Sequence, residues 1–213
     1  SGCKLIDMEM VQFHPTGMLF PEEMEGTLVT EAVRGEGGHL YNIKGERFMN
    51  NYDEKRMELS TRDSIAKANY NEIKEGRGTQ RGGVFLDISH IEKDKILSRL
   101  PTIYKQILDY QKIDISNDPI EVAPTAHYSM GGINVNSDNH ATNVEGLFAV
   151  GEVAGGLHGA NRLGGNSLAE ILVFGKITGK CASLYSRKIK TKPEPTKSLK
   201  VAHENIDKKL KQG

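Results

Sequence analysis

The sequence predicts a mixed α/β fold in which an α+β insert interrupts a domain built on a parallel sheet. Segments with the period of a strand alternate with segments of helical period along most of the 213 residues. Residues 147–150 read LFAV, and such a short, fully apolar run is typical of a buried parallel strand. We expect the insert at residues 15–126, with parts of the parallel-sheet domain on both sides and the first strands of that sheet missing from this chain.

The first half of the chain is expected to contain three strand or turn segments and one helix. The segments are residues 5–13, a strand; 26–38, a short strand with a glycine-rich turn; and 41–49, a hairpin. The helix begins at Ser60 and Thr61, with Asp63 behind them, because small polar residues favour helix starts. Gly76 ends it, since glycine readily adopts the backbone conformation found after a helix.

The second half is expected to carry more helix. Short strands are predicted at residues 84–88, near 121–122 and at 132–135. Pro101 separates two helices, because proline is tolerated in the first turn of a helix and is costly inside one. Asn166 opens a long apolar helix that runs to about Arg187. Residues 192–195 read as a linker, and the chain ends within another helix.

The composition is that of a globular protein without a membrane span or a metal site. Hydrophobic residues make up 37% and charged residues 26% of the chain. No apolar run approaches the roughly 18 residues that cross a bilayer. The two cysteines, Cys3 and Cys181, form no CxxC pair, so neither zinc nor an iron–sulfur cluster is predicted. Two isolated thiols fit a reducing compartment.

The charge is balanced overall but uneven along the chain. Residues 187–213 contain nine Lys or Arg against three Asp or Glu, whereas the rest contains 19 against 25. A basic tail can contact nucleic acid or acidic lipid. Aromatic residues that would stack on bases are not interleaved with these charges. We therefore favour a solvated helix and predict no nucleic-acid partner.

Five clusters place charged or polar residues where packing does not require them. They are His14–Gly17, Thr30–Glu31 with Arg34–Gly37, Arg62–Asp63, His127–Gly132 and His158–Ser167. Each alone has an ordinary structural explanation, such as a strand end, a surface ion pair or a turn. Together they suit a small dicarboxylate, because arginine presents a planar fork to a carboxylate and histidine adds a directed hydrogen bond. The glycines keep side chains away, so that backbone can approach a flat ring.

The same clusters resemble the flavoprotein subunit of succinate dehydrogenase and fumarate reductase. The strings that carry the resemblance are, in order, HPTG, TEAVRGEGG, TRDSIAKA, PTAHYSMGGI, GLFAVGE and LHGANRLGGNSLAEILVFG. They lie between Leu5 and Gly179, nearly the whole chain. L-aspartate oxidase is the nearest sister family. Met130 and the RLGGNS string after Asn161 favour the fumarate and succinate branch.

The resemblance implies a Rossmann-like FAD-binding domain, of which this chain holds the C-terminal part, and a mobile capping domain. The implied division is 1–14, FAD-binding domain; 15–126, capping domain; 127–186, FAD-binding domain; and 187–213, a linker with the start of a C-terminal helical region. The GxGxxG loop that binds the FAD pyrophosphate in this family does not occur here. We therefore expect a fragment that is inactive and binds FAD weakly when it is alone.

Roles for individual residues are carried over by position in the strings. Arg62 matches the arginine that delivers a proton to the substrate, and Glu31 and Arg34 match the relay that reprotonates it. The residues matching ligands of the two substrate carboxylates are His14, Thr30, His127 and Arg162. The residues matching FAD contacts are Glu152, Ser167 and Leu168. No metal ligand is implied.

Physical arguments agree with these implied roles. A helix N-terminus carries about half a positive elementary charge, which at Ser167 would stabilise an anionic reduced flavin. Arginine is a poor acid unless its proton is replaced at once, which Glu31 and Arg34 would do. Because one carboxylate needs both a fork and a directed donor, we expect His127 and Arg162 to lie together at one small-anion site.

Two alternatives remain open on the sequence: L-aspartate oxidase activity, and an inactive fragment that only assembles with its missing half. For the complete enzyme, the resemblance implies that the partner is an iron–sulfur subunit. It also implies a cytoplasmic protein that associates with a membrane only through partner subunits. The sequence does not show in which direction the reaction runs physiologically, nor which electron donor or acceptor the enzyme uses.

Overall fold

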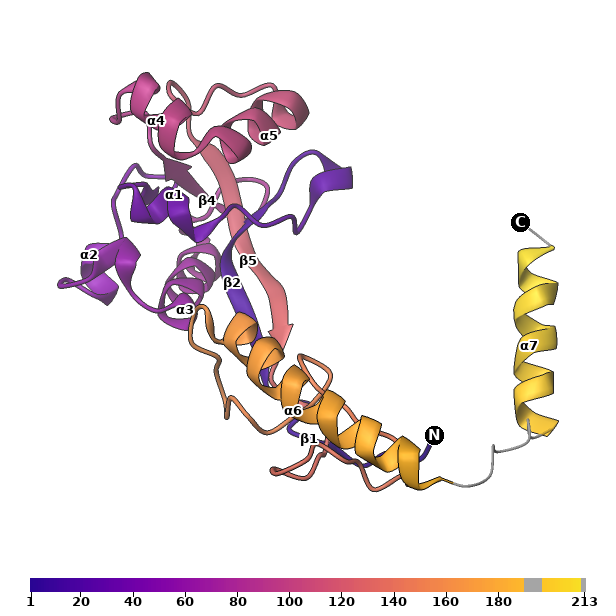
Figure 1. Ribbon diagram of the computed structural model, residues 1–213. Helices are drawn as coiled ribbons and strands as arrows, with labels where there is room; N and C mark the ends of the chain where they lie inside the picture. Colours follow the sequence, from indigo (N-terminus) through magenta and orange to yellow (C-terminus); the bar gives the residue numbers. More distant parts are fainter. Residues whose placement is uncertain (190–196, 212–213) are drawn as a thin grey trace.

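The computed structural model describes residues 1–189 and 197–211 and shows a mixed α/β protein (Figure 1). The strands are β1 Leu5–Ile6, β2 Val11–Met18, β3 His39–Tyr41, β4 Val84–Asp87, β5 Ile120–Ser129 and β6 Gly132–Ile133. The helices are α1 Glu31–Gly35, α2 Met49–Tyr52, α3 Arg62–Glu72, α4 Lys93–Arg99, α5 Pro101–Gln111, α6 Asn166–Lys188 and α7 Lys197–Leu210. Short 3-10 turns lie at Glu22–Met24 and Met57–Leu59, and a π turn at Ile73–Arg77 follows α3.

Two sheets organise the chain. The larger sheet has the strand order β2-β5-β4-β3, and every neighbouring pair in it is antiparallel. The smaller sheet pairs β1 with β6. Helices α1 to α5 gather around the larger sheet, whereas α6 lies beside β1 and the end of the β2–β5 pair (Figure 1). Both expected boundaries of the insert, 14/15 and 126/127, fall within the β2–β5 pair, so this pair would connect the two expected domains.

Two irregularities in the β2–β5 pair decide where the functional side chains point. Gln12 pairs with Tyr128 and Phe13 with Ala126, so His127 is an extra residue on β5. On β2, His14 pairs with Thr125 and Gly17 with Ala123, so that strand also carries an extra residue. Such β-bulges bend a strand and redirect the side chains next to them. In this chain one bulge lies at His127 on β5 and the other follows His14 on β2, so both change the direction of the side chains near the two histidines.

The hydrophobic core lies between the larger sheet and the helices around it. Helix α3 packs its buried face against β2 and β5, with Ile65 and Ala68 fully buried. Burying an isoleucine side chain stabilises a fold by about 1.5–3 kcal/mol. The same helix contributes Asn69, whose side-chain amide donates to the Pro15 carbonyl at 2.8 Å. That hydrogen bond holds the bulged part of β2 against the helix.

Several predicted elements are confirmed. Strand β4 lies at the predicted position, and Pro101 occupies the first turn of α5 directly after α4. Helix α3 begins after Thr61, and Gly76 adopts a φ of 74° in the turn that follows it. Helix α6 spans the predicted segment, and α7 is the predicted last helix. The predicted linker at 192–195 lies outside the described residues.

The hairpin predicted at 41–49 is wrong in its strands, although the chain does turn at Lys44 and Gly45, where the Gly45 amide donates to the Asn42 carbonyl at 3.0 Å. Strand β3 pairs with β4 instead, and α2 begins at Met49. Phe48 and Met49 are adjacent and only 1% and 0% exposed. An alternating strand cannot bury two consecutive side chains on one face.

Two further strand predictions are corrected. The segment 26–38 contains helix α1 in place of a simple glycine-rich turn, because Thr30 caps it by accepting from the Ala32 amide at 3.3 Å. Residues 147–150 form no parallel strand in the described structure. Phe148 makes only an isolated antiparallel bridge to Ala141, and its ring lies 5.9 Å from that of Tyr185.

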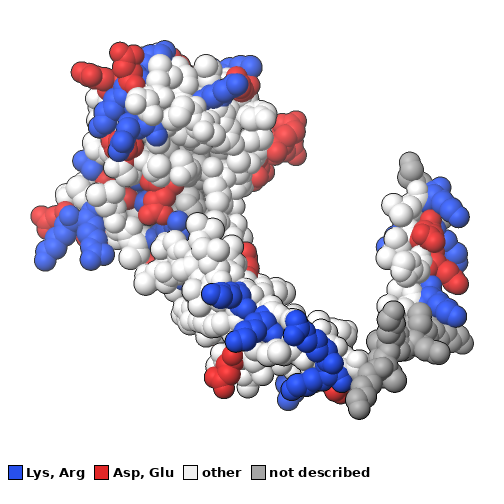
Figure 2. All heavy atoms as spheres, viewed as in Figure 1, with Lys and Arg blue, Asp and Glu red and all other residues white. Residues whose placement is uncertain are grey.

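Helix α6 and the last helix have different surfaces. On α6 the basic side chains of its second half stand out, and α7 carries basic and acidic side chains side by side (Figure 2). Leu168 and Leu172 on α6 are 66% and 74% exposed. Among the described helices, none has both the length and the hydropathy needed to cross a membrane.

Candidate functional site

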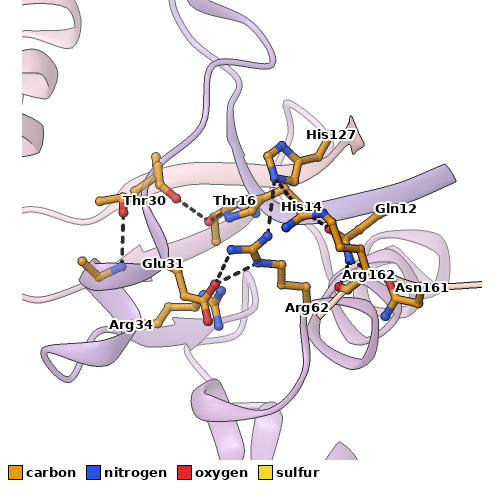
Figure 3. A network of polar contacts seen from close by, with 12 residues as sticks. Gln12, His14, Thr16, Thr30, Glu31, Arg34, Arg62, His127, Asn161 and Arg162 are labelled. Carbon is orange, nitrogen blue, oxygen red and sulfur yellow. Dashed lines mark hydrogen bonds and ion pairs between the residues drawn. The ribbon is translucent and has the colours of Figure 1, made fainter. Parts of the chain in front are cut away.

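The bulges in the β2–β5 pair bring two histidines together. His14 on β2 and His127 on β5 have ring centroids 5.3 Å apart in an edge-to-face arrangement (Figure 3). The Nδ1 atom of His14 accepts from the Thr16 amide at 3.3 Å, so a neutral His14 carries its proton on Nε2. His14 is buried, and Thr16 anchors itself by donating its hydroxyl to the Val29 carbonyl at 2.9 Å.

Arg62 and Arg162 meet at His127. The Nη1 atom of Arg62 lies 3.4 Å and the Nη2 atom of Arg162 lies 3.3 Å from the Nε2 atom of His127 (Figure 3). Guanidinium groups only donate, so this nitrogen is the acceptor and the imidazole is neutral. Positions 127 and 162 are thus adjacent in space, as predicted for a shared anion site. Arg62 is placed there by the first turn of α3, and Arg162 by the loop before α6.

Glu31 holds the other side of Arg62. Its Oε2 atom accepts from Nε of Arg62 at 2.8 Å and lies 2.8 Å from Nη2. Glu31 is the first residue of α1, which the cap of Thr30 starts at that point. Arg34 lies one turn further along α1 and is buried, and its Nη1 donates to the Glu58 carbonyl at 2.7 Å. The Arg62 guanidinium therefore lies between a histidine and a carboxylate.

A polar bridge fixes the loop that carries Arg162. The Gln12 amide donates to the Arg162 carbonyl and to Asn161 Oδ1, both at 2.6 Å, and its oxygen accepts from Arg162 Nη2 at 3.0 Å. Asn161 in turn donates to Asp63 at 3.0 Å, which links the loop to the first turn of α3. Gln12 and Asn161 thus set the relative position of the two arginines, Arg62 and Arg162.

The electrostatics favour an anion at this cluster. Burial, together with the charges of Arg34 and Arg62, lowers the pKa of His14 to about 4. Burial and the charges of Arg62 and Arg162 likewise lower the pKa of His127. For Glu31, burial acts to raise the pKa, but the hydrogen bond and charge of Arg62 outweigh it and the net pKa is lowered. Both histidines are neutral and the glutamate is charged near neutral pH, so the positive charge of the arginines is only partly compensated.

Buried nitrogen atoms show that donors are in excess. Within the described residues, Nε and Nη2 of Arg34 and Nε of Arg162 are buried and have no hydrogen-bond partner. Buried polar atoms in proteins are nearly always satisfied, and the exceptions mark strain, function or a missing partner. A ligand rich in acceptor oxygens would answer this excess.

The remaining predicted residues lie around this cluster. Thr30 is exposed and its hydroxyl caps α1. The Glu152 carboxylate accepts from the Ser129 amide at 2.9 Å. Ser167 and Leu168 lie in the first turn of α6, where Gly165 occupies the N-cap with a φ of 83° and no side chain caps the helix. A Cβ atom added at Gly164 would meet only Arg62, at 3.9 Å, so the loop backbone faces the same space as that arginine.

Sequence reasoning missed Gln12, and it named Thr16 and Asn161 only as members of polar clusters, without assigning their roles. Gln12 is 2% exposed on a strand whose neighbours Val11 and Phe13 are more than 40% exposed, an inversion of the usual pattern that marks a buried polar contact. Among the described residues, no group of three or more His, Cys, Asp or Glu is arranged to hold a metal ion.

The fold and the cluster define an α/β protein with a basic site suited to a small anion. Comparison with known proteins gives the family. A profile described as "FAD binding domain" matches residues 1–168. The chain belongs to this FAD-binding family, which includes the flavoprotein subunits of fumarate reductases and succinate dehydrogenases, and FAD is its cofactor.

Individual relatives are similar over most of this chain. The "8-methylmenaquinol:fumarate reductase flavoprotein subunit" of Wolinella succinogenes is 48% identical over 191 aligned positions, 87% of this chain and 30% of the relative. The "Succinate dehydrogenase flavoprotein subunit" of Rickettsia felis is 42% identical over 221 aligned positions, 98% of this chain and 36% of the relative. A solved structure, "Quinol-Fumarate Reductase with Menaquinol Molecules", superimposes with a TM-score of 0.84 at 41% identity, covering 99% of this chain and 38% of that one. The chain thus spans about a third of the length of the relatives it matches.

Proposed function

We propose that this chain supplies the substrate-binding and proton-transfer groups of an FAD-dependent enzyme that interconverts fumarate and succinate. The observation that carries the proposal is the meeting of Arg62 and Arg162 at His127, beside the ion pair of Arg62 with Glu31. The relatives named as fumarate reductases and succinate dehydrogenases support the substrate. In the same proposal, residues 15–126 are a capping domain, and residues 1–14 and 127–186 belong to the FAD-binding domain.

The substrate carboxylates would bind to the donors that are in excess. Arg162 and the Nε2–H of His14 would supply donors to the substrate, and Thr30 would lie at the edge of the site. His127, whose Nε2 atom accepts from both arginines in the unliganded chain, would join them where the substrate replaces these contacts. A dicarboxylate offers acceptor oxygens at both ends, and an arginine fork binds a carboxylate through paired hydrogen bonds. Holding both ends orients the double bond and withdraws charge from it, which favours attack on one alkene carbon.

The start of α6 fits the cofactor. It is the N-terminus of a 23-residue helix with no side-chain cap, preceded by glycines that leave its backbone open. Such an end favours negative charge. Ser167 and Leu168 would contact the flavin ring there, and Glu152 would hydrogen-bond to FAD. When bound, FAD supplies the hydride that is added to one alkene carbon, or accepts it in the reverse reaction.

Arg62 would give the proton to the other alkene carbon. It projects from the start of α3, where a cation is poorly placed with respect to the helix dipole, and Glu31 compensates it. After Arg62 gives its proton, Glu31 is in hydrogen-bond contact to pass on another. Arg34, one turn away on α1, would complete the route with its buried guanidinium. In this proposal the two residues would form the relay that a weak acid such as arginine requires.

The test is catalysis by the full-length protein with its flavin. Fumarate reduction is measured with a reduced artificial electron donor, and succinate oxidation with an artificial acceptor. Oxidation of L-aspartate by oxygen in place of either reaction would support the sister activity. Full-length flavoprotein that reduces no fumarate and oxidises no succinate would contradict the proposal. Co-purification with an iron–sulfur protein is expected of the complete enzyme.

A further inference from the structure

A buried carboxylate lies behind Arg162 and takes no part in the proposed proton transfer. Glu170, in the second turn of α6, is 4% exposed. Its Oε2 atom accepts from the Tyr128 hydroxyl at 2.9 Å and lies 2.9 Å from His158 Nε2. The three residues come from β5, from the loop before α6 and from α6 itself. We call them the Glu170 triad: Glu170, Tyr128 and His158.

Tyr128 connects this triad to the anion site. The guanidinium carbon of Arg162 lies 4.2 Å from the centroid of the Tyr128 ring. A cation over an aromatic face is stabilised, and more strongly when both groups are shielded from water. Arg162 is 5% exposed, and its guanidinium also contacts Gln12 and His127. The Tyr128 ring is therefore the surface against which the guanidinium rests.

The triad fixes this ring at its hydroxyl and at one side. The hydroxyl is held by Glu170, and the His158 ring meets the tyrosine edge-to-face with centroids 5.7 Å apart. Burial and the hydrogen bond to Glu170 raise the pKa of Tyr128 to about 12, so its hydroxyl stays a donor across the physiological range. A carboxylate is costly to bury, and an apolar residue of similar volume would fill the same position without that cost.

We propose that Glu170 and His158 are positioning residues that act through the Tyr128 ring on Arg162, and so set the affinity for the substrate carboxylate. This inference rests on the proposed function, in which Arg162 binds that carboxylate. It assigns a task to two residues that have no role in the proposed binding of substrate or flavin. A purely structural triad would contribute to folding stability and leave the anion affinity unchanged.

The chain contains a matched control pair of the same chemistry. The Tyr185 hydroxyl donates to Glu145 at 3.2 Å, and this pair is exposed and belongs to the second half of α6 and the loop it contacts. The test uses the full-length flavoprotein with the variants Tyr128→Phe, Glu170→Leu and both together, next to Tyr185→Phe and Glu145→Leu. Succinate binding is measured by isothermal titration calorimetry, and flavin content and thermal unfolding are measured on the same samples.

We expect Tyr128→Phe and Glu170→Leu each to weaken succinate binding by about three- to tenfold, the range that one lost hydrogen bond produces. The double variant should be no weaker than the weaker single variant, because both changes remove the same hydrogen bond. KM for fumarate should rise with little change in kcat, since the flavin and Arg62 are untouched. The control variants should bind succinate within about twofold of the wild type.

Three results would overturn the inference. They are unchanged succinate affinity in Tyr128→Phe, an equal loss in the control variants, or losses that multiply in the double variant. If Glu170→Leu does not fold, Tyr128→Phe still decides, because it only removes one hydroxyl. Wild-type protein that binds no dicarboxylate would contradict the proposed function and this inference together, whereas normal wild-type binding with unaffected variants contradicts the inference alone.

Discussion

Two arginine–glutamate clusters in this chain differ in how completely their hydrogen bonds are satisfied. The Glu72 carboxylate accepts four hydrogen bonds: two from Arg77 at 2.7 Å, one from Asn42 at 2.9 Å and one from Tyr52 at 2.8 Å. Its side chain is 3% exposed. The hydrogen bonds of Arg77, which outweigh the effect of burial, lower the pKa of Glu72 to about 2. Each donor around this carboxylate therefore has its acceptor.

The cluster at Arg62 has the opposite balance. Arg34 and Arg162 keep buried nitrogen atoms without a partner in the described structure, and Arg34 is 2% exposed. Burial and neighbouring positive charge lower the pKa of both arginines, although Glu31 acts to raise that of Arg34. A saturated cluster stabilises the fold, whereas the surplus of buried donors in the cluster at Arg62 is the feature on which we base the proposed anion site.

The largest effect is expected for Arg62→Ala in the full-length enzyme. Loss of the proposed proton donor should lower fumarate reduction by at least about 10²–10⁴-fold, the usual contribution of general acid catalysis. Flavin binding should persist, because Arg62 lies on α3 and the proposed flavin contacts lie at the start of α6. Lysine should restore little activity, since a point charge does not reproduce the fork. Steady-state fumarate reduction and the flavin spectrum are the measurements.

The matched control for Arg62 is Arg77→Ala, which removes an arginine from the saturated cluster. It should destabilise the protein and leave kcat unchanged. Near-normal turnover in Arg62→Ala would show that the proton comes from another group. The family membership would not be affected by this result.

The second effect is on stability. Glu72→Ala removes the acceptor of four hydrogen bonds, and it leaves Asn42 and Tyr52 without the buried carboxylate to which they donate. We expect the free energy of unfolding to fall by about 3 kcal/mol, as when one partner of a buried ion pair is removed. Chemical denaturation followed by circular dichroism measures it. Succinate affinity that falls in parallel would contradict the separation of the two clusters.

The cluster at Arg62 could be predicted from the sequence more fully than the cluster at Glu72. Arg62, His127 and Arg162 stand out because each lies in a polar string that packing does not require, and the meeting of His127 with Arg162 was predicted. Helix α3, the break at Pro101 and the long α6 were also predicted, since their signals are local. The roles of the site residues, including the FAD contacts, remain predictions.

Contacts that depend on distant partners were not predictable. The extra residue at His127 is seen only when β5 is paired with β2, because a bulge is a property of two strands. Gln12 meets Arg162 across 150 positions, and Glu72 meets Asn42 across 30. The LFAV segment has the composition of a buried strand, but no neighbouring strand pairs with it as a ladder among the described residues. Composition alone does not supply the partner that makes a strand.

The third prediction concerns pH. The pKa of His14 is about 4 in the folded chain, compared with 6.5 for a free histidine, so the unfolded chain binds more protons between these values. Stability should therefore rise with pH through this window. It should be lost as pH falls from about 6.5 to 4, by about 3 kcal/mol. In His14→Gln the unfolding free energy should be flatter over this range. An equal slope in the variant would show that other groups cause the acid sensitivity.

The smallest effect on stability, and the sharpest test of the comparison, is expected for Arg34→Met. Arg34 is buried with two unpartnered nitrogen atoms among the described residues, and its Nη1 donates to the Glu58 carbonyl. Removing a buried, poorly compensated charge in favour of an apolar side chain of similar length is often neutral or stabilising. The unfolding free energy should stay the same or rise by about 1 kcal/mol, while fumarate reduction falls because the proposed relay behind Glu31 is cut. The carboxylate of Glu31 still contacts Arg62 in this variant, so substrate affinity should change little and the loss should appear in kcat.

A variant of the saturated cluster, Arg77→Met, should show the reverse pattern, with lower stability and unchanged kcat. If Arg34→Met instead destabilises the protein as much as Arg77→Met does, then its guanidinium is a structural group, and surplus buried donors in this chain do not mark function.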